Sequence, residues 1–326
     1  MPESMTALFG GCGPGSQARQ VPVPEPGPGQ VLVRAYAVSI NNADIAMLAS
    51  ADPDTGHGTE YRADYEFAGE IAAVGPGVDD TRIGEHVMGT APESFAQYVI
   101  ADHRHMFAIP QGVGYEDAAA LPTGLLTEHG ALMLGEFQPG QTVLITGATS
   151  SIGLIGVQIA RVLGAKCVVA TSRTAAKTDL LKRTGADVVI ATTTQDLTGG
   201  ILEATSEQGA DIVLDHVGGH TLSRCLAATH LGGRIINIGR LDQAESTINL
   251  DTLSYRQLRL RGVSFTFSQA DELGQVIAAA SELLPAVADG RVRPVIDAVL
   301  NFEQANAAAD RLRNNRGVGK IVLTLA

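Results

Sequence analysis

A Gly/Ser-rich turn lies between an apolar run and an apolar helical pattern in VLITGATSSIGLIGVQIARVLGA (residues 143–165). A bound phosphate needs backbone N–H donors, the positive end of a helix and no side chain in its way. Gly147, Ser150 and Gly153 keep the outer spacing of a dinucleotide-binding turn, with serine at the middle position. Because the turn follows a predicted strand and opens a predicted helix, we expect it to hold a pyrophosphate rather than to be a turn without a ligand.

The end of the next predicted strand indicates which dinucleotide is bound. A site for NAD usually has Asp or Glu there for the ribose hydroxyls, but VVATSRTAAK contains no acid before Asp179. Ser172, Arg173 and Lys177 offer a hydroxyl and two cations, which suit a 2′-phosphate. The alternative is a solvated helix start with ordinary basic residues. The missing carboxylate and the two cations together favour NADP(H) over NAD.

Two different patterns of apolar residues predict the domains that position these residues. From Gln141 onward, six strand-like runs follow one another, and helical patterns lie between several of them. Apolar runs without alternation are typical of a parallel sheet covered by helices, and six of them predict a doubly wound α/β domain. The first third instead has short alternating strands between Gly and Pro turns, which indicates a compact barrel-like domain. Between them, residues 115–135 predict a helix, a break at Pro122 and a second helix.

The bulk composition excludes several classes of function. A net charge of -12 disfavours nucleic-acid binding, because phosphate backbones need clustered cations. No run approaches the roughly 20 apolar residues of a membrane helix, and the first residues lack the pattern of a signal peptide. Cys12, Cys167 and Cys225 are far apart, so we expect reduced thiols in a cytoplasmic protein.

Segments along the whole chain resemble one known family in their order and spacing. They are PEPGPGQVLVR (24–34), SINNAD (39–44), EFAGEIAAVGPGV (66–78), AAALPTGLLTEHGAL (118–132), the turn at 147, DHVGG (215–219) and GVGKIVL (317–323). The chain resembles the zinc-independent members of the medium-chain dehydrogenase/reductase superfamily, in the quinone oxidoreductase (zeta-crystallin-like) branch. The resemblance implies a GroES-like β-barrel-type catalytic domain from residues 1–122 and 267–326. A Rossmann NADP-binding domain would occupy residues 123–266.

The resemblance also assigns site residues and a partner. It implies that Asn41, near the nicotinamide, and Thr127, in the helix below the ring, are catalytic as well as cofactor-binding. The family's other cofactor positions fall on Gly147, Ser150, Ser151, Ile152 and Gly153 for the pyrophosphate, Ser172, Arg173 and Lys177 for the 2′-phosphate, Val217, Gly218, Ile238 and Gly239 at the ends of later strands, and Ser264 and Phe265 beside the carboxamide. A homodimer paired through the last Rossmann strand, around GVSFTF (262–267), is the implied assembly.

The sequence departs from the family at two tyrosine positions and from its zinc-dependent members at the metal. Ala46 stands where several members carry a tyrosine, and Ala191 or a neighbouring threonine stands at the position of a second tyrosine. Zinc-dependent relatives need an early Cys and a Gly-His-Glu motif. Here SINNAD offers neither Cys nor His, and Tyr65 stands at the histidine position. His103 and His105 are more simply a polar strand end than a metal pair. The sequence therefore predicts no zinc.

These patterns predict an NADPH-dependent reductase of quinones or α,β-unsaturated carbonyls that works by hydride transfer. One alternative is an enoyl-thioester reductase. Another is a non-catalytic NADPH-binding protein with a sensor or structural role. A short-chain reductase is rejected because that family pairs a Tyr with a Lys four residues later, whereas Tyr255 here has Arg259.

Overall fold

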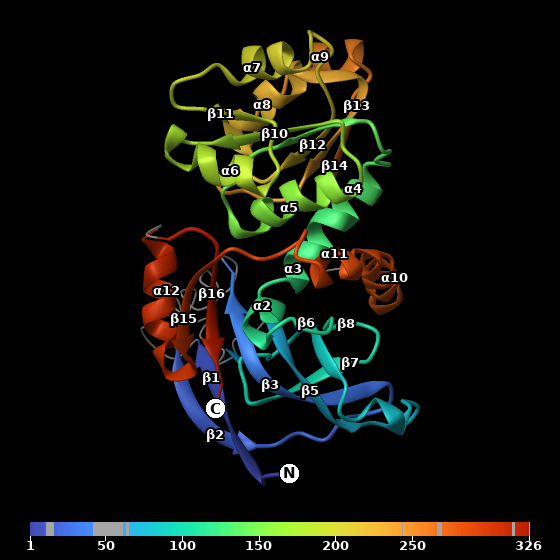
Figure 1. Cartoon of the computed structure of the whole chain (residues 1–326), viewed down its shortest axis with the longest axis vertical. Helices are drawn as coiled ribbons and strands as arrows, with labels where there is room; N and C mark the ends of the chain where they lie inside the picture. Colours follow the sequence, from blue (N-terminus) through green and yellow to red (C-terminus); the bar gives the residue numbers. More distant parts are fainter. Residues whose placement is uncertain are drawn as a thin grey trace. The chain divides into compact units, whose positions relative to one another are not determined.

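The computed structural model describes residues 1–10, 16–41, 61–62, 65–242, 244–265, 269–314 and 317–325. The chain forms two compact units, both shown in Figure 1. Unit 1 comprises Met1–Thr123, Asp271–Ala288 and Pro294–Ala326, and unit 2 comprises Gly124–Ala270 and Asp289–Arg293. Both ends of the chain therefore belong to unit 1.

Unit 2 is built on a six-stranded parallel sheet. Its strands are β9 (Thr142–Ile145), β10 (Cys167–Ser172), β11 (Val188–Ala191), β12 (Ala210–Asp215), β13 (Thr229–Asn237) and β14 (Arg259–Gly262). They lie in the order β11-β10-β9-β12-β13-β14, and every neighbouring pair is parallel. The order reverses between β9 and β12, which is where doubly wound sheets bind their ligands. The predicted fold class of this part is confirmed.

Helices cover both faces of this sheet, as Figure 1 shows. Helices α5 (Ser151–Val162) and α6 (Thr178–Thr184) lie on one face. Helices α7 (Leu197–Ala204), α8 (Gly219–Ala227) and α9 (Leu250–Tyr255) lie on the other. All four residues of β9 are buried. Burial on both faces explains why these strands read as continuous apolar runs rather than as alternating ones.

The predicted helix, break and second helix between residues 115 and 135 are also present. Helix α2 (Tyr115–Ala119) ends before Pro122, which begins α3 (Pro122–Gly124). Proline suits a first helical position because its missing N–H would have no acceptor there. The chain continues through a π-helical turn, η2 (Leu125–His129), into α4 (Gly130–Leu134). Single π-helical turns are rare in proteins, and many of those that do occur lie at functional sites.

Unit 1 contains two β-sheets. The larger has the order β15-β16-β3-β5-β6-β8, with β7 paired to β3. Its strands are β3 (Gln30–Ile40), β5 (Tyr65–Val74), β6 (His86–Ala91), β7 (Tyr98–Asp102), β8 (Met106–Ala108), β15 (Ile296–Asn301) and β16 (Lys320–Thr324). The smaller contains β2 (Gln17–Pro22), β1 (Ser4–Gly10) and β4 (Tyr61–Arg62). This is the GroES-like architecture that the resemblance implied.

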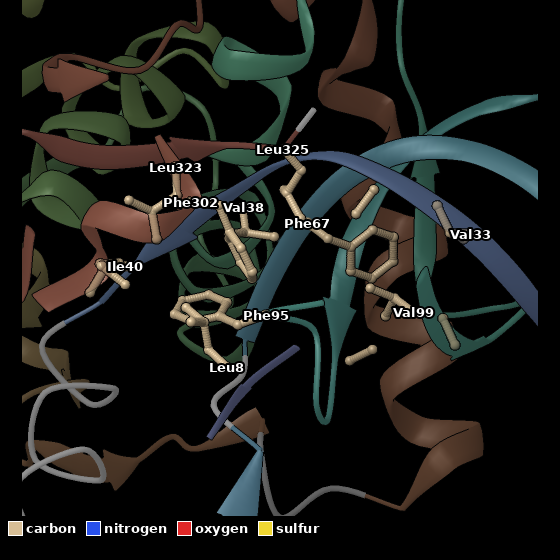
Figure 2. Packing of buried hydrophobic residues seen from close by; sticks show 14 of the residues in the cluster. Leu8, Val33, Val38, Ile40, Phe67, Phe95, Val99, Phe302, Leu323 and Leu325 are labelled. Carbon is tan, nitrogen blue, oxygen red and sulfur yellow. The ribbon is translucent and has the colours of Figure 1, made fainter. Parts of the chain in front are cut away.

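Strand β16, from the C-terminal end of the chain, lies inside the larger sheet. It pairs antiparallel with β3 and parallel with β15. Figure 2 shows side chains from both ends of the sequence in one apolar cluster, with Leu323 near Val38 and Phe302. Phe67 and Phe95 are buried in the same cluster. The core of unit 1 therefore includes side chains from the C-terminal strands.

Helical segments from the last part of the chain complete unit 1. They are α10 (Ala270–Ala280), whose first residue lies at the unit boundary, η5 (Ser281–Leu283), α11 (Leu284–Ala288), η6 (Phe302–Gln304) and α12 (Ala305–Arg313). A search of the described residues finds no helix that is both long and apolar enough to span a bilayer.

Candidate functional site

The turn after β9 is packed so closely that two of its glycines could not carry a side chain without displacement. Gly147 has a φ of +57°, and a Cβ there would lie 3.0 Å from Val217 Cγ2. A Cβ on Gly153 would lie 2.8 Å from Ala148 Cα. The Gly147 and Ala148 N–H groups donate to Thr171 Oγ1 and Thr171 O, each at 3.0 Å. The turn is thus fixed to the end of β10 and presents bare backbone.

The N-terminus of α5 supplies hydrogen-bond donors beside the Gly147 turn. Ser150 is the N-cap residue, and its Oγ accepts a hydrogen bond from Gly153 N at 3.1 Å. Its hydroxyl hydrogen remains available to an acceptor. Ser151 and Ile152 are the first residues of α5, so their N–H groups have no acceptor within the helix. These donors and the helix dipole fit a bound pyrophosphate.

The end of β10 carries two unneutralised cations. Ser172 is buried, Arg173 is exposed and Lys177 is half-buried in the 3₁₀ turn η3 (Ala175–Lys177). Neither cation has a carboxylate partner among the described residues. The carbonyl of Arg173 accepts from the N–H and hydroxyl of Thr193, at 3.1 and 2.7 Å. The backbone here is therefore held by the segment after β11, while both cations are available to an anion.

Asp215, at the end of β12, organises the turns around it. Its buried carboxylate accepts from Thr146 Oγ1 at 2.8 Å, from Val217 N at 3.1 Å and from Gly218 N at 3.2 Å. Asn237 Nδ2, from β13, donates to its second oxygen at 3.0 Å. One carboxylate therefore joins the ends of three neighbouring strands.

The backbone of Asp215 binds the remaining predicted positions on this side of the sheet. Its carbonyl oxygen accepts from Ile238 N at 2.8 Å and from Gly239 N at 3.1 Å. Sequence reasoning assigned these neighbours but not Asp215 itself. The available signal was an acid directly after a buried apolar strand, in DIVLDHVGG.

Ser264 and Phe265 continue the chain beyond β14. Val263 N donates to Asn237 O at 3.0 Å, which keeps this segment beside the end of β13. Ser264 is exposed and Phe265 is half-buried. Unit 2 thus brings together most of the predicted positions at the carboxyl edge of its sheet.

Asn41 and Thr127 belong to different units and are described separately. Thr127 is half-buried in the π-helical turn η2, which packs on α5. A Cβ on Gly124, just before this turn, would lie 2.4 Å from Ile155 Cδ1 of α5. The turn that carries Thr127 therefore packs on α5, the helix that begins at the end of the Gly147 turn.

Asn41, at the end of β3, is fixed by a buried ion pair in unit 1. Glu66 and Lys320 are 0% and 1% exposed, and the Lys320 ammonium contacts Glu66 Oε2. Asn41 Nδ2 donates to Glu66 Oε2 at 2.9 Å, and Lys320 Nζ donates to Asn41 Oδ1 at 2.5 Å. Both ends of the Asn41 amide are therefore bound, so its orientation is set.

Two further donors complete the surroundings of Glu66. Ser39 Oγ and Thr123 N donate to its two oxygens, each at 2.6 Å. Burial by itself raises the pKa of Glu66, but the Lys320 charge and these hydrogen bonds hold the pKa below its ordinary value. The sequence motifs around Glu66 and Lys320 did not predict a role for either residue. A charged residue beside an apolar run, in EFAG and KIVL, was the available signal.

The predicted departures from the family fall partly outside the described residues. Ala46 lies there, as does the side chain of Tyr65. Ala191 ends β11 with a buried side chain, and its N–H donates to Gln195 Oε1 at 2.7 Å. Within the described ranges, no group of three or more His, Cys, Asp and Glu side chains could hold a metal ion.

Comparisons with protein-family models identify both parts of the chain. A model of the alcohol dehydrogenase GroES-like domain matches residues 27–132. A model named zinc-binding dehydrogenase matches residues 151–282. The word zinc belongs to the name of that family and does not show that this chain binds the metal. The expected absence of zinc from this chain stays a prediction.

Solved structures of similar proteins cover nearly the whole chain. A mycobacterial quinone oxidoreductase is 26% identical with a TM-score of 0.87, over 99% of this chain and 100% of that one. A mycobacterial protein solved in complex with NADPH is 27% identical with a TM-score of 0.84, over the same shares of the two chains.

Curated relatives at higher identity are much larger proteins. A mycocerosic acid synthase-like polyketide synthase of Mycobacterium tuberculosis is 34% identical over 234 residues, which are 71% of this chain. The matched region is 11% of that synthase, so the chain resembles one segment of it.

We predict that Lys320→Met will lower the free energy of unfolding by about 3–5 kcal/mol at pH 7, because it leaves the Glu66 carboxylate buried without its cation. Urea unfolding followed by circular dichroism measures this. The double variant Glu66→Gln/Lys320→Met should recover part of the loss, since no buried charge remains. Lys182→Met, at an exposed position of α6, is the control. Equal effects of Lys320→Met and Lys182→Met would contradict the prediction.

The lowered pKa of Glu66 also predicts acid sensitivity. The stabilisation is present above the ordinary pKa of a glutamate and is lost as the pH falls through the lowered pKa of Glu66. Stability of the wild type should therefore fall more steeply below pH 5 than that of Glu66→Gln/Lys320→Met. Parallel pH-dependent curves for the two proteins would contradict this assignment.

Proposed function

The chain belongs to the medium-chain dehydrogenase/reductase superfamily, in its quinone oxidoreductase-like branch, and we propose that it is an NADPH-dependent reductase of quinones or α,β-unsaturated carbonyls. The observation that carries the cofactor assignment is the pattern of charged residues at the end of β10. Arg173 and Lys177 have no carboxylate partner there among the described residues, and Ser172 is followed by no acid before Asp179. This charge pattern fits the additional phosphate of NADPH.

The residues that would hold NADPH follow from their chemistry. The turn at Gly147, the Ser150 hydroxyl and the first N–H groups of α5 would bind the pyrophosphate. Arg173 and Lys177 would bind the 2′-phosphate. When bound, NADPH supplies a hydride to an electron-poor carbon. The start of α5 supports this assignment, because the N–H groups of Ser151 and Ile152 have no acceptor within the helix.

The part we assign to the protein in catalysis is alignment of the two reactants and exclusion of water. Asn41 and Thr127 are the proposed catalytic residues. The Glu66–Lys320 pair keeps the Asn41 amide in one orientation, so Asn41 can contact a ligand without reorganising. We assign stabilisation of the reduced substrate to hydrogen bonds rather than to a metal, with solvent as the source of the proton.

The substrate class has two candidates. Similarity to a mycobacterial quinone oxidoreductase over nearly the whole chain supports a quinone or an enone. Similarity to a segment of a polyketide synthase supports an enoyl thioester instead. Both substrates present a carbon–carbon double bond conjugated to a carbonyl, so the same hydride chemistry serves either.

We further propose that two copies pair through β14. This strand lies at the edge of the six-stranded sheet, and all four of its residues are exposed. Leu260, in its middle, is 39% exposed. An exposed edge strand carries unpaired backbone groups that a second strand can complete.

The double variant Arg173→Ala/Lys177→Ala should raise the Kd for NADPH about tenfold or more, because each charge-assisted contact to a phosphate contributes more than 1 kcal/mol. The Kd for NADH should stay within about twofold, since NADH lacks the 2′-phosphate. Calorimetry measures both. Lys182→Ala/Arg183→Ala removes the same charge from exposed positions of α6 and should leave both constants unchanged. Equal weakening of NADPH and NADH would disprove the 2′-phosphate assignment.

Turnover tests the proposed activity directly. We expect NADPH consumption, followed by cofactor absorbance, with at least one acceptor from a panel of quinones, short enones and enoyl thioesters, and little consumption of NADH. The best acceptor decides between the two substrate classes. Binding of NADPH without consumption across the panel would instead support the non-catalytic, sensor or structural alternative.

Leu260→Asp should convert a dimer to a monomer, because the new charge would be buried in the strand pairing. Sedimentation equilibrium measures the mass. Leu250→Asp, at an exposed position of α9, is the control and should stay dimeric. A wild type that is monomeric at high concentration would refute the β14 assignment.

A further inference from the structure

Glu128 is a buried acid to which the proposed reaction assigns no role. It follows Thr127 in the π-helical turn and is 0% exposed. Its Oε1 lies 3.0 Å from Nε2 of His216, whose side chain is 5% exposed. Neither oxygen of Glu128 accepts an aligned hydrogen bond from any described residue. The His216 ring is therefore the partner of a carboxylate that has little else to stabilise it.

The other side of Glu128 packs on bare backbone. A Cβ on Gly156 of α5 would lie 2.2 Å from Glu128 Oε2. Glycine at this position leaves the space that the carboxylate occupies. The acid is thus fully buried between its own turn, helix α5 and the His216 ring.

His216 connects this turn to the strand ends. Its N–H donates to Thr146 Oγ1 at 3.0 Å, at the end of β9, and its carbonyl accepts from Leu241 N at 3.1 Å, after β13. A Cβ on Gly239 would lie 2.6 Å from the same carbonyl oxygen. The backbone of His216 is therefore part of the edge where β9, β12 and β13 end, while its ring reaches η2.

The charge of the pair depends on the His216 proton. Burial by itself lowers the pKa of His216, but the Glu128 carboxylate, helped by Asp215, holds the pKa above its ordinary value. These two acids are the charged groups that act on the ring. The residues that pack on the pair from β9, α5 and the segment after β13 are uncharged: Thr146, Gly156, Gly239 and Leu241.

We propose that the Glu128–His216 ion pair holds the turn that carries Thr127 against the carboxyl ends of β9 and β12, so that protonation of His216 strengthens binding of the nicotinamide half of NADPH. This inference rests on the proposed function. Loss of the His216 proton leaves the enclosed carboxylate without a positive charge beside it, which favours movement of η2 away from the strand ends. Glu128 and His216 are positioning residues, because they act through Thr127.

Two binding measurements separate this effect from the titration of the cofactor. The Kd values of NADPH and of 2′-phospho-ADP-ribose, which keeps the pyrophosphate but lacks the nicotinamide, are measured by calorimetry between about pH 6 and 9. The 2′-phosphate titrates in both ligands and the pyrophosphate in neither, so the pH dependence of the ratio of the two constants reports the nicotinamide. We expect NADPH to lose about tenfold relative to 2′-phospho-ADP-ribose as His216 deprotonates, a usual size for coupling between two groups.

Variants identify the pair as the cause. In Glu128→Gln, and in Glu128→Gln/His216→Asn, the ratio should not change with pH. Glu203→Gln removes an exposed acid from α7 and should behave as the wild type. The NMR spectrum of histidine-labelled protein, assigned through His216→Asn, should show His216 charged above pH 6.5 in the wild type and neutral there in Glu128→Gln. If the variants fail to fold, the wild-type ratio and spectrum decide the matter.

Three outcomes would overturn the inference. One is a constant ratio of the two Kd values in wild type that binds NADPH. Another is a His216 signal that titrates at or below the ordinary pKa of histidine. The third is a complete absence of NADPH binding, which rejects the proposed function and this inference together. The spectrum, which needs no ligand, then shows separately whether the ion pair exists.

Discussion

The carboxylate of Asp215 is the interaction on which the edge of the parallel sheet depends. A buried carboxylate must be matched by donors, and those available here are the hydroxyl that follows β9, the amide that ends β13 and the N–H groups of the turn after β12. Satisfying them all brings three strand ends to one point. The turn at Gly147 is packed against this point, because Val217 Cγ2 would lie 3.0 Å from a Cβ on Gly147.

Unit 1 uses a buried charge for the same purpose but joins more distant parts of the chain. Glu66 lies on β5 and Lys320 on β16, 254 residues apart in sequence. Their pairing orients Asn41 and also fastens the C-terminal strand to the N-terminal sheet. Such a pair costs desolvation, so it contributes to stability only while every hydrogen-bonding partner is in place. In return, the pair fixes the orientation of the Asn41 amide at the end of β3.

A common arrangement emerges from the two units. The residues that we propose to touch ligand, Asn41 and Thr127, are each next to or bonded to a buried acid with a cationic or ionisable partner. Glu66 has Lys320, and Glu128 has His216. In contrast, the cations at the end of β10 have no carboxylate partner among the described residues, which leaves them available to an anion. Buried charges position these side chains, and we propose that the cations at the end of β10 select the ligand.

The sequence by itself determined the fold class, the six-stranded sheet and the tight turn at Gly147, because burial on both faces and tight turns leave local patterns of apolar residues and glycine. It also supplied the cations at Arg173 and Lys177, which lie a few residues apart. The roles of Asp215, Glu66, Lys320 and the Glu128–His216 pair appeared only in the tertiary structure. Each depends on a partner far along the chain, and strand order, not local pattern, decides which distant residues meet.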